Sequence, residues 1–129
     1  MKILIVEDQA PVARMLTASL NRWGHETQIA ETGQNAMELM EKEMFDLILL
    51  DIHLPDAMAY DLIPRMKRAW SGMEIITMTG HNSRDLEKKI RSQGILYYMV
   101  KPINMAELRA IIDHLGLKRG IPLADITAT

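Results

Sequence analysis

The sequence predicts a single α/β domain in which helices cover both faces of a parallel β-sheet. Short apolar runs alternate along the chain with longer amphipathic stretches, and 129 residues suit one domain with one sizeable core. The runs at residues 3–6, 47–50 and 75–76 are apolar on both faces, which is typical of strands that are buried on both sides. Strands that alternate with helices through short loops indicate right-handed crossovers in a doubly wound fold.

Five strands are expected, and short helical signals lie between them. The strands are placed at residues 2–6, 26–30, 47–50, 74–78 and 97–100. In the first helix Pro11 can occupy the first turn, and Gly24 ends the helix. A single stripe then faces the core, formed by Val12, Met15, Leu16, Leu20 and Trp23. The second helix is marked by Ala36, Leu39 and Met40.

The remaining helices are placed by their caps and by one proline. Because proline is tolerated only in a first helical turn, Pro64 makes us start the third helix near Asp61. Asn82 or Ser83 can cap the fourth helix, whose Leu86 and Ile90 face inward. The fifth begins at a capping box formed by Asn104 and Glu107, and its inward positions are Leu108, Ile111, Ile112 and Leu115. We therefore expect a folded domain over residues 1–116, followed by a tail or linker over residues 117–129.

Composition excludes several classes of function. The chain is 48% hydrophobic and 25% charged, with a net charge of -2 and no cysteine. Disulfides and thiolate metal sites are therefore excluded, and the charge gives no general attraction to nucleic acid or membranes. The basic residues of positions 84–91 have the spacing of a solvated helix face, so we expect no direct nucleic-acid binding. The first apolar run is too short for a signal peptide or membrane span, and a cytoplasmic location is expected.

Charged and polar side chains follow the predicted strands at the edge where ligands bind in doubly wound folds. Glu7 and Asp8 follow the first strand, Asp51 follows the third, Thr79 follows the fourth, and Lys101 follows the fifth. Crowded carboxylates repel one another unless cations neutralise them. Lys101 supplies one positive charge, and Mg²⁺ is the expected second cation because it favours a few carboxylates with water and phosphate. A metal, a lysine and a hydroxyl suit the transfer of a phosphoryl group to a carboxylate.

These residues give the chain a specific family resemblance. It resembles response-regulator receiver domains over about residues 2–115, through the stretches 2–8, 23–26, 30–33, 46–55 and 98–102. The resemblance implies a flavodoxin-like, five-stranded sheet of order 2-1-3-4-5 with five helices. It also implies a phosphorylation-activated signalling switch of a two-component system. Such a receiver catalyses its own phosphorylation and slow dephosphorylation, and we do not expect it to be an enzyme that acts on other substrates.

The resemblance implies a role for each site residue. Asp51 would accept the phosphoryl group from a histidine kinase or phosphotransfer protein. The Mg²⁺ ligands would be Asp8 directly, Glu7 through water, Asp51, and the backbone carbonyl of His53. Lys101, before a cis bond to Pro102, would contact the phosphoryl oxygens. Thr79 would move toward the phosphoryl group and Tyr98 would rotate inward, which changes the face formed by the fourth helix, fifth strand and fifth helix.

Three features set this chain apart from the family pattern. Ala59 stands where glycine is usual, so either the backbone is strained or the loop differs. His53 and His81, two residues beyond Asp51 and Thr79, are hypothesised to tune the lifetime of the phosphorylated state; two solvated histidines are the alternative.

The segment before the fifth strand is the third feature. Ile95, Leu96 and Tyr97 stand where a small residue and two acidic residues are common, which predicts an apolar patch for a protein partner or a homodimer. The alternative is that Leu96 and Tyr97 pack beneath the fourth helix. The downstream partner or fused effector is not identified by the sequence.

Two other functions compete with the phosphorylation switch. A binding-only relative of the fold would have lost the acidic pair, Asp51 or Lys101, and all are present. A hydrolase with an aspartyl-phosphate intermediate would need an Asp-x-Asp pair, but His53 occupies the second position.

Overall fold

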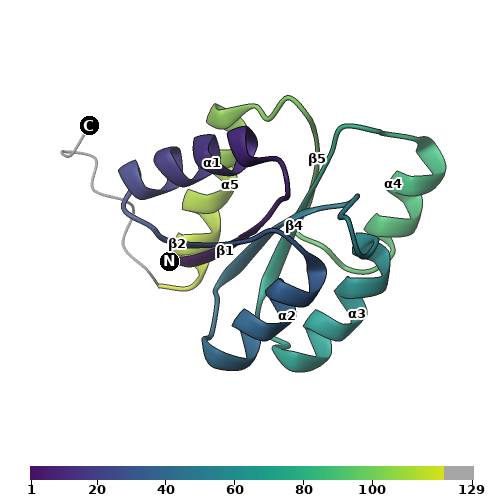
Figure 1. The fold of residues 1–129 in the computed structure, drawn as a ribbon. Helices are drawn as coiled ribbons and strands as arrows, with labels where there is room; N and C mark the ends of the chain where they lie inside the picture. Colours follow the sequence, from purple (N-terminus) through teal and green to yellow (C-terminus); the bar gives the residue numbers. More distant parts are fainter. Residues whose placement is uncertain (121–129) are drawn as a thin grey trace.

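The computed structural model describes residues 1–120 as five strands that alternate with five helices (Figure 1). All strand pairs are parallel, and the order in the sheet is β2-β1-β3-β4-β5. This confirms the predicted doubly wound fold and strand order. The strands are β1 (Lys2–Val6), β2 (Glu26–Ala30), β3 (Leu47–Asp51), β4 (Glu74–Thr79) and β5 (Tyr97–Val100).

Strands β3 and β4 each extend one residue beyond the predicted end. Asp51 is the last residue of β3 and pairs with Met78, while Thr79 is the last residue of β4 and pairs with Val100. Strand geometry therefore fixes the backbone of two residues that the sequence assigned to the site. Side chains at the end of a buried strand have little backbone freedom, which suits a preorganised site.

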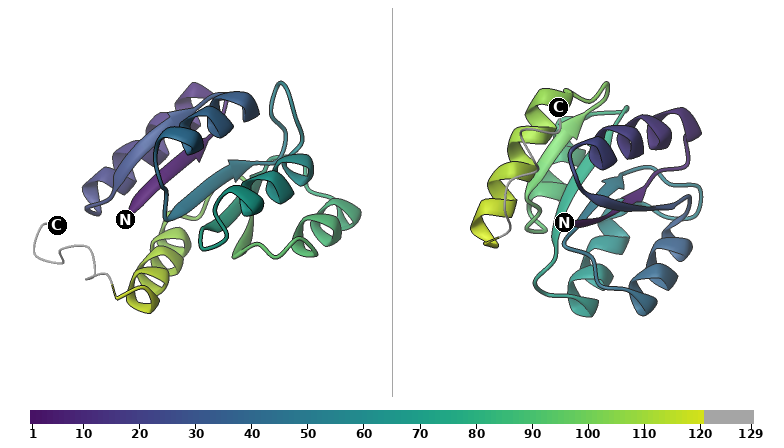
Figure 2. Two further views of the ribbon diagram at one scale, coloured as in Figure 1. Left: turned by 90° about the horizontal axis from the view of Figure 1, so that it is seen from below. Right: turned by 90° about the vertical axis from the view of Figure 1, so that its left-hand side faces the viewer.

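The helices divide into two groups that cover opposite faces of the sheet (Figures 1 and 2). On one face, α1 (Ala10–Arg22) and α5 (Met105–Lys118) pack on Ile3, Ile5 and Leu49. On the other, α2 (Gly33–Lys42), α3 (Ala59–Ala69) and α4 (Arg84–Arg91) pack on Leu4, Val6 and Ile48. The central strands are apolar on both sides because each face contacts a separate helical layer.

The first helix differs from the prediction at one position. Leu16 and Leu20 are fully buried and Val12 is partly buried, but Met15 is 42% exposed. The buried stripe passes through Ala13 instead, three residues before Leu16. Periodicity gave the correct helix but placed Met15 on the wrong face, because residue 15 lies at the edge of an amphipathic stripe.

Helix α3 begins two residues before the predicted start. It starts at Ala59, so Pro64 lies within the helix and beyond the first turn. The backbone amide of Ala59 donates to the carbonyl of Ile52 at 2.9 Å, and the Ala59 side chain is fully buried. None of the non-glycine residues in the range 1–120 has a positive φ, so the backbone strain considered for Ala59 is absent.

The last two helices are capped by residues that the sequence predicted, although of the capping box at α5 only the bond to the Asn104 side chain is present. Ser83 is the N-cap of α4, and its hydroxyl accepts from the amide of Leu86 at 3.1 Å. Asn104 caps α5 and accepts from the amide of Glu107 at 3.0 Å. Helix α5 extends to Lys118, and Gly116 is buried within it. Most of the expected tail, residues 121–129, lies outside the described residues. Over residues 1–120, no helix is both long and apolar enough to cross a bilayer.

Candidate functional site

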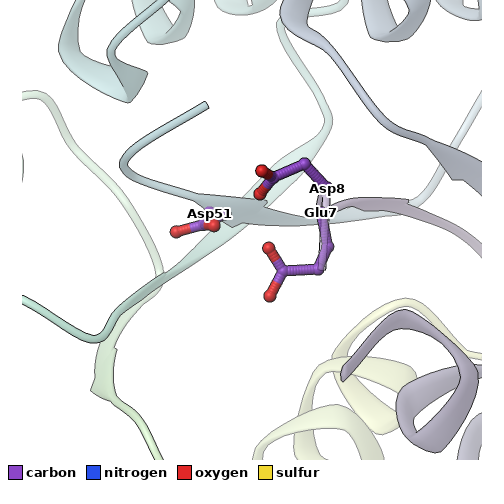
Figure 3. A group of neighbouring side chains, drawn as sticks. All are labelled: Glu7, Asp8 and Asp51. Carbon is purple, nitrogen blue, oxygen red and sulfur yellow. The ribbon is translucent and has the colours of Figure 1, made fainter. Parts of the chain in front are cut away.

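Three carboxylates meet at the carboxyl ends of β1 and β3. Glu7 and Asp8 directly follow β1, and Asp51 ends β3, so the pairing of these neighbouring strands brings them together. One carboxylate oxygen from each of the three lies within 4.8 Å of the others, and the side chains point toward a common space (Figure 3). The predicted convergence is therefore present in the structure.

Lys101 lies against two of these carboxylates. Its Nζ is 2.5 Å from Glu7 Oε1 and 3.4 Å from Asp51 Oδ2. The backbone amide of Lys101 donates to the carbonyl of Thr79 at 2.7 Å, and the Lys101–Pro102 peptide bond is cis as the resemblance implied. The connection from β5 to α5 thus holds one ammonium group directly over the acidic residues.

The pocket over these residues is small and polar. It has a volume of about 130 Å³, and its lining consists of Asp8, Gln9, Asp51, His53, Gly80, His81 and Lys101. Gln9 was not predicted; its side-chain oxygen lies 3.4 Å from Lys101 Nζ. The only sequence signal for Gln9 is that it follows the acidic pair directly. Thr79 lies just beneath the pocket, fully buried, with its hydroxyl accepting from the amide of His81 at 3.0 Å.

Glu7 is the most strongly perturbed group of the site. Its side chain is buried, and this burial together with the nearby Asp51 carboxyl raises the pKa of Glu7 from 4.5 to about 7, although Lys101 opposes the rise. Its Oε2 atom is buried with no hydrogen-bond partner. A buried oxygen without a donor, beside two other carboxylates, has the chemistry of a site for a hard divalent cation, so the residues present fit Mg²⁺.

Two histidines border the pocket. The amide of His53 donates to Asp51 Oδ1 at 3.3 Å. The rings of His53 and His81 meet edge to face, with centroids 5.5 Å apart and an interplanar angle of 84°. The Nδ1 atom of His53 is buried without a partner. The two positions singled out from the sequence are therefore in contact with each other and with the pocket.

Tyr98 already lies inside the protein in this structure. Its side chain is 5% exposed, and its hydroxyl donates to Asn82 Oδ1 at 2.7 Å. The sequence suggested Asn82 only as a helix cap, a role that Ser83 fills. The guanidinium of Arg91 lies 5.5 Å from the centre of the Tyr98 ring. Tyr98 therefore joins β5 to both ends of the α4 region.

Asp56 is a second residue that sequence reasoning missed. Its two carboxylate oxygens accept from the amides of Gly33 at 2.8 Å and Gln34 at 3.0 Å. These bonds lower the pKa of Asp56, because they stabilise its charged form at the start of α2. Asp56 thereby ties the loop after Asp51 to α2. The signal available in the sequence was an acidic residue in a loop, which is too common to identify a distant helix as its partner.

At the start of β5 one side chain is partly buried and the next is exposed. Leu96 is partly buried and packs against the core beneath α1 and α5, whereas Tyr97 is 36% exposed. Neither side chain packs under α4 as one alternative supposed. Both instead line an apolar groove of about 370 Å³ whose α5 side is formed by Ala110, Ile111, His114, Leu115 and Lys118. An apolar feature is present, and it lies between β5 and α5.

The fold and the site define a doubly wound α/β protein with an acidic pocket at the carboxyl ends of its strands. The family model for the response regulator receiver domain matches residues 3–113, and the chain belongs to this family. The general function of the family, which this chain shares, is that of a phosphorylation switch in two-component signalling.

Individual relatives support the same assignment. The chain is 33% identical over 118 residues to the sporulation initiation phosphotransferase F of Bacillus subtilis, covering 91% of this chain and 95% of that one. It is 37% identical over 120 residues to the transcriptional regulatory protein CusR of Escherichia coli, covering 93% of this chain but only 52% of the relative. A CheY-like receiver domain from Methanospirillum hungatei has a TM-score of 0.84 and 30% identity, and the match covers 92% of this chain and 96% of that one.

Proposed function

We propose that Asp51 is the phosphoacceptor of this receiver domain, and that its donor is a histidine kinase or a phosphotransfer protein. The observation that carries this proposal is the convergence of Glu7, Asp8 and Asp51 within 4.8 Å, with Lys101 in contact with two of the three. Asp51 ends a rigid, buried strand and still lines the pocket. It is therefore both held in place and accessible to a small phosphoryl group.

In the proposed reaction an oxygen of Asp51 attacks the phosphorus of a phosphohistidine. The new P–O bond forms as the P–N bond breaks, and the imidazole nitrogen of the donor leaves with the bonding electron pair. Lys101 lies 3.4 Å from Asp51 and can neutralise the charge that gathers on the phosphoryl oxygens. The amide of His53 already donates to Asp51 Oδ1, and this bond orients the carboxylate.

Glu7, Asp8, Asp51 and the backbone carbonyl of His53 are proposed to hold Mg²⁺. When bound, the metal supplies positive charge to the anionic phosphoryl group and allows it to approach the carboxylates. The partnerless Oε2 of Glu7 supports this assignment, because a buried oxygen is stabilised by a cation or an ordered water. Thr79 is proposed to turn its hydroxyl from the His81 amide toward the phosphoryl group, and Tyr98 to report that change to the α4–β5–α5 face.

His53 and His81 are proposed to tune how long the phosphoryl group stays on Asp51. Both line the pocket and touch each other, so they control the approach of water to Asp51. Replacing both by Ala should change the dephosphorylation rate measured from about pH 6 to pH 8. An identical rate profile in the double variant would instead assign both side chains to the solvated loop surface.

The output of the switch is proposed to be a contact with another protein. The apolar groove beside Leu96 and Tyr97 adjoins the α4–β5–α5 face and suits a downstream protein or a homodimer. Some relatives, such as CusR, are about twice as long as this chain, so a fused effector is a second way for a receiver to pass on its state. Slow autodephosphorylation, a cytoplasmic location and the absence of direct nucleic-acid binding stay predictions.

Acetyl phosphate tests the phosphoacceptor directly. The native protein, incubated with Mg²⁺ and acetyl phosphate, should gain the mass of one phosphoryl group in an intact-mass measurement. Asp51→Asn keeps the size of the side chain but removes the nucleophilic oxygen, so it should gain none. A matched control is Asp85→Asn on the exposed surface of α4, which should react like the native protein. Equal labelling of Asp51→Asn and the native chain would overturn the assignment.

A further inference from the structure

Pro64 leaves one backbone carbonyl of α3 without its usual partner. In an α-helix the amide of residue 64 would donate to the carbonyl of Tyr60, but proline has no amide hydrogen. In this structure the Tyr60 carbonyl accepts a hydrogen bond from the side chain of Gln93, with Nε2 at 2.7 Å. Gln93 belongs to the turn that follows α4, so a side chain from outside the helix replaces the missing bond.

Two further contacts join α3 to the end of α4 and the turn after it, and the two helices lie side by side (Figures 1 and 2). Lys89 Nζ lies 3.8 Å from the centre of the Tyr60 ring, which is a cation–π distance. Lys67 Nζ donates to the carbonyl of Gly94 at 2.6 Å. All three contacts fall on residues 89–94, at the carboxyl end of α4 and in the turn that follows it.

The amino end of α4 is attached differently. Residues 80–85 are exposed, and Leu86 is only partly buried, whereas Ile90 near the other end is fully buried. The amino end is also the one that follows Thr79 and His81, so it lies next to the phosphoacceptor pocket. Asn82, bonded to the Tyr98 hydroxyl, lies in this same exposed stretch. One end of the helix is thus held against α3 and the other adjoins the site.

The start of α3 is in turn joined to the loop after Asp51. The Ala59 amide donates to the Ile52 carbonyl at 2.9 Å, and Tyr60 is the next residue. The carbonyl that Gln93 holds is therefore only one residue from a direct link to the phosphoacceptor segment. The geometry of the hydrogen bond between Gln93 and Tyr60 therefore depends on the position of the loop after Asp51 and on the position of α4.

We propose that Gln93 is a positioning residue that latches the carboxyl end of α4 to the carbonyl freed by Pro64. The latch makes that end a fixed pivot, so that the change driven by phosphorylation is confined to the amino half of α4. The latch stands on contacts of this structure alone, while its role as a pivot rests on the proposed phosphorylation of Asp51. Pro64 leaves the Tyr60 carbonyl free and Gln93 bonds to it, so the two residues act as one unit.

Amide hydrogen exchange of the unphosphorylated protein, followed by NMR, tests the latch. Gln93→Leu removes the donor and keeps the side-chain size, and exchange of residues 88–94 should accelerate about five- to tenfold, the effect of losing one hydrogen bond. Lys88→Ala, on the exposed side of the same helix, is the matched control and should have no such effect. Unchanged exchange in Gln93→Leu would overturn the latch.

Pro64→Ala separates the latch from general packing. Alanine restores an amide that competes with Gln93 for the Tyr60 carbonyl, so residues 88–94 should loosen while α3 itself becomes more protected. In the Pro64→Ala background Gln93→Leu should then change exchange less than about twofold. Fully additive effects of the two substitutions would show that Gln93 holds α4 equally well whether or not residue 64 supplies an amide, and would refute the proposed unit.

Beryllofluoride with Mg²⁺, a stable mimic of the phosphoryl group, tests the pivot. In the native protein the exchange changes should lie at residues 80–87, and in Gln93→Leu they should spread to residues 88–94. Equal changes at both ends of α4 in the native protein would refute the pivot. If beryllofluoride altered no amide anywhere, the phosphoacceptor proposal and the pivot would fail together, while the latch measured without it would stand.

Discussion

The raised pKa of Glu7 predicts that the site destabilises the fold at neutral pH when no divalent cation is present. The rise from 4.5 to about 7 corresponds to roughly 3 kcal/mol, because each pKa unit is worth about 1.4 kcal/mol. Since the pKa is raised on folding, the favourable contribution of protonated Glu7 is fully present below pH 4.5. It is lost as the pH rises through about 7. Glu7→Gln, which is neutral at every pH, removes this dependence.

The assay is urea denaturation followed by circular dichroism, in buffer with EDTA, at intervals from pH 5 to pH 8. The free energy of unfolding of the native protein should fall relative to that of Glu7→Gln by roughly 2.5 kcal/mol across this range, because the rest of the effect is lost below pH 5. Glu41→Gln, an exposed glutamate on α2, serves as the matched control and should follow the native curve. Parallel curves for the native protein and Glu7→Gln would refute the electrostatic account of the site.

Three other substitutions or conditions have defined outcomes. Mg²⁺ at about one hundred times its Kd should raise the free energy of unfolding of the native protein by about 2.7 kcal/mol and that of Asp8→Asn by much less; equal gains would place the ion elsewhere. Leu49→Ala, at a fully buried position between the sheet and the α1–α5 layer, should cost about 2–5 kcal/mol in urea denaturation. Burial lowers the pKa of His25, so stability is lost as the pH falls through that lowered value. His25→Gln should therefore reduce the loss of stability between about pH 7 and 5. An equal loss in the variant and the native protein would contradict this.

The fold was predictable because its signals are local. Each strand is a short apolar run, and the ends of β3 and β4 differ from prediction by one residue, Asp51 or Thr79. The start of α3 was not predictable from the rule that excludes proline from a helix interior. That rule assumes that the freed carbonyl has no other partner, but Gln93, 33 positions from Tyr60 in the chain, supplies one. Tertiary contacts of this kind leave no periodic trace in the sequence.

The sequence predicted which carboxylates converge at the site better than it predicted the contacts between the side chains. Topology alone brings the ends of β1 and β3 together, so the convergence of Glu7, Asp8 and Asp51 followed from the expected order of strands. Which carboxylate Lys101 would approach more closely depends on side-chain packing, and the structure places Glu7 at 2.5 Å and Asp51 at 3.4 Å. Asp56 and the bond between Asn82 and Tyr98 were missed, because each joins elements that are remote along the chain.

The geometry of Lys101 predicts opposite effects of one substitution on stability and on reactivity. The ammonium group proposed to assist phosphoryl transfer to Asp51 is held mainly by Glu7. The same crowding that raises the pKa of Glu7 brings together the carboxylates proposed to bind a divalent cation. Glu7→Gln should therefore be more stable than the native protein in EDTA at pH 8. With Mg²⁺ and acetyl phosphate its initial rate of phosphorylation should fall about 10- to 100-fold, the usual effect of losing an outer ligand of a metal site.

Initial rates from intact mass, measured beside Glu41→Gln at several Mg²⁺ concentrations, separate the two effects. A variant whose rate recovers at high Mg²⁺ has lost metal affinity alone, which fits a role for Glu7 in holding the ion. A rate that stays low at saturating Mg²⁺ shows that Glu7 also positions Lys101 for the transfer. A variant that is both more stable and as reactive as the native protein at every Mg²⁺ concentration would show that the buried carboxylate serves neither purpose. The crowding of acidic groups would then have no link to phosphorylation.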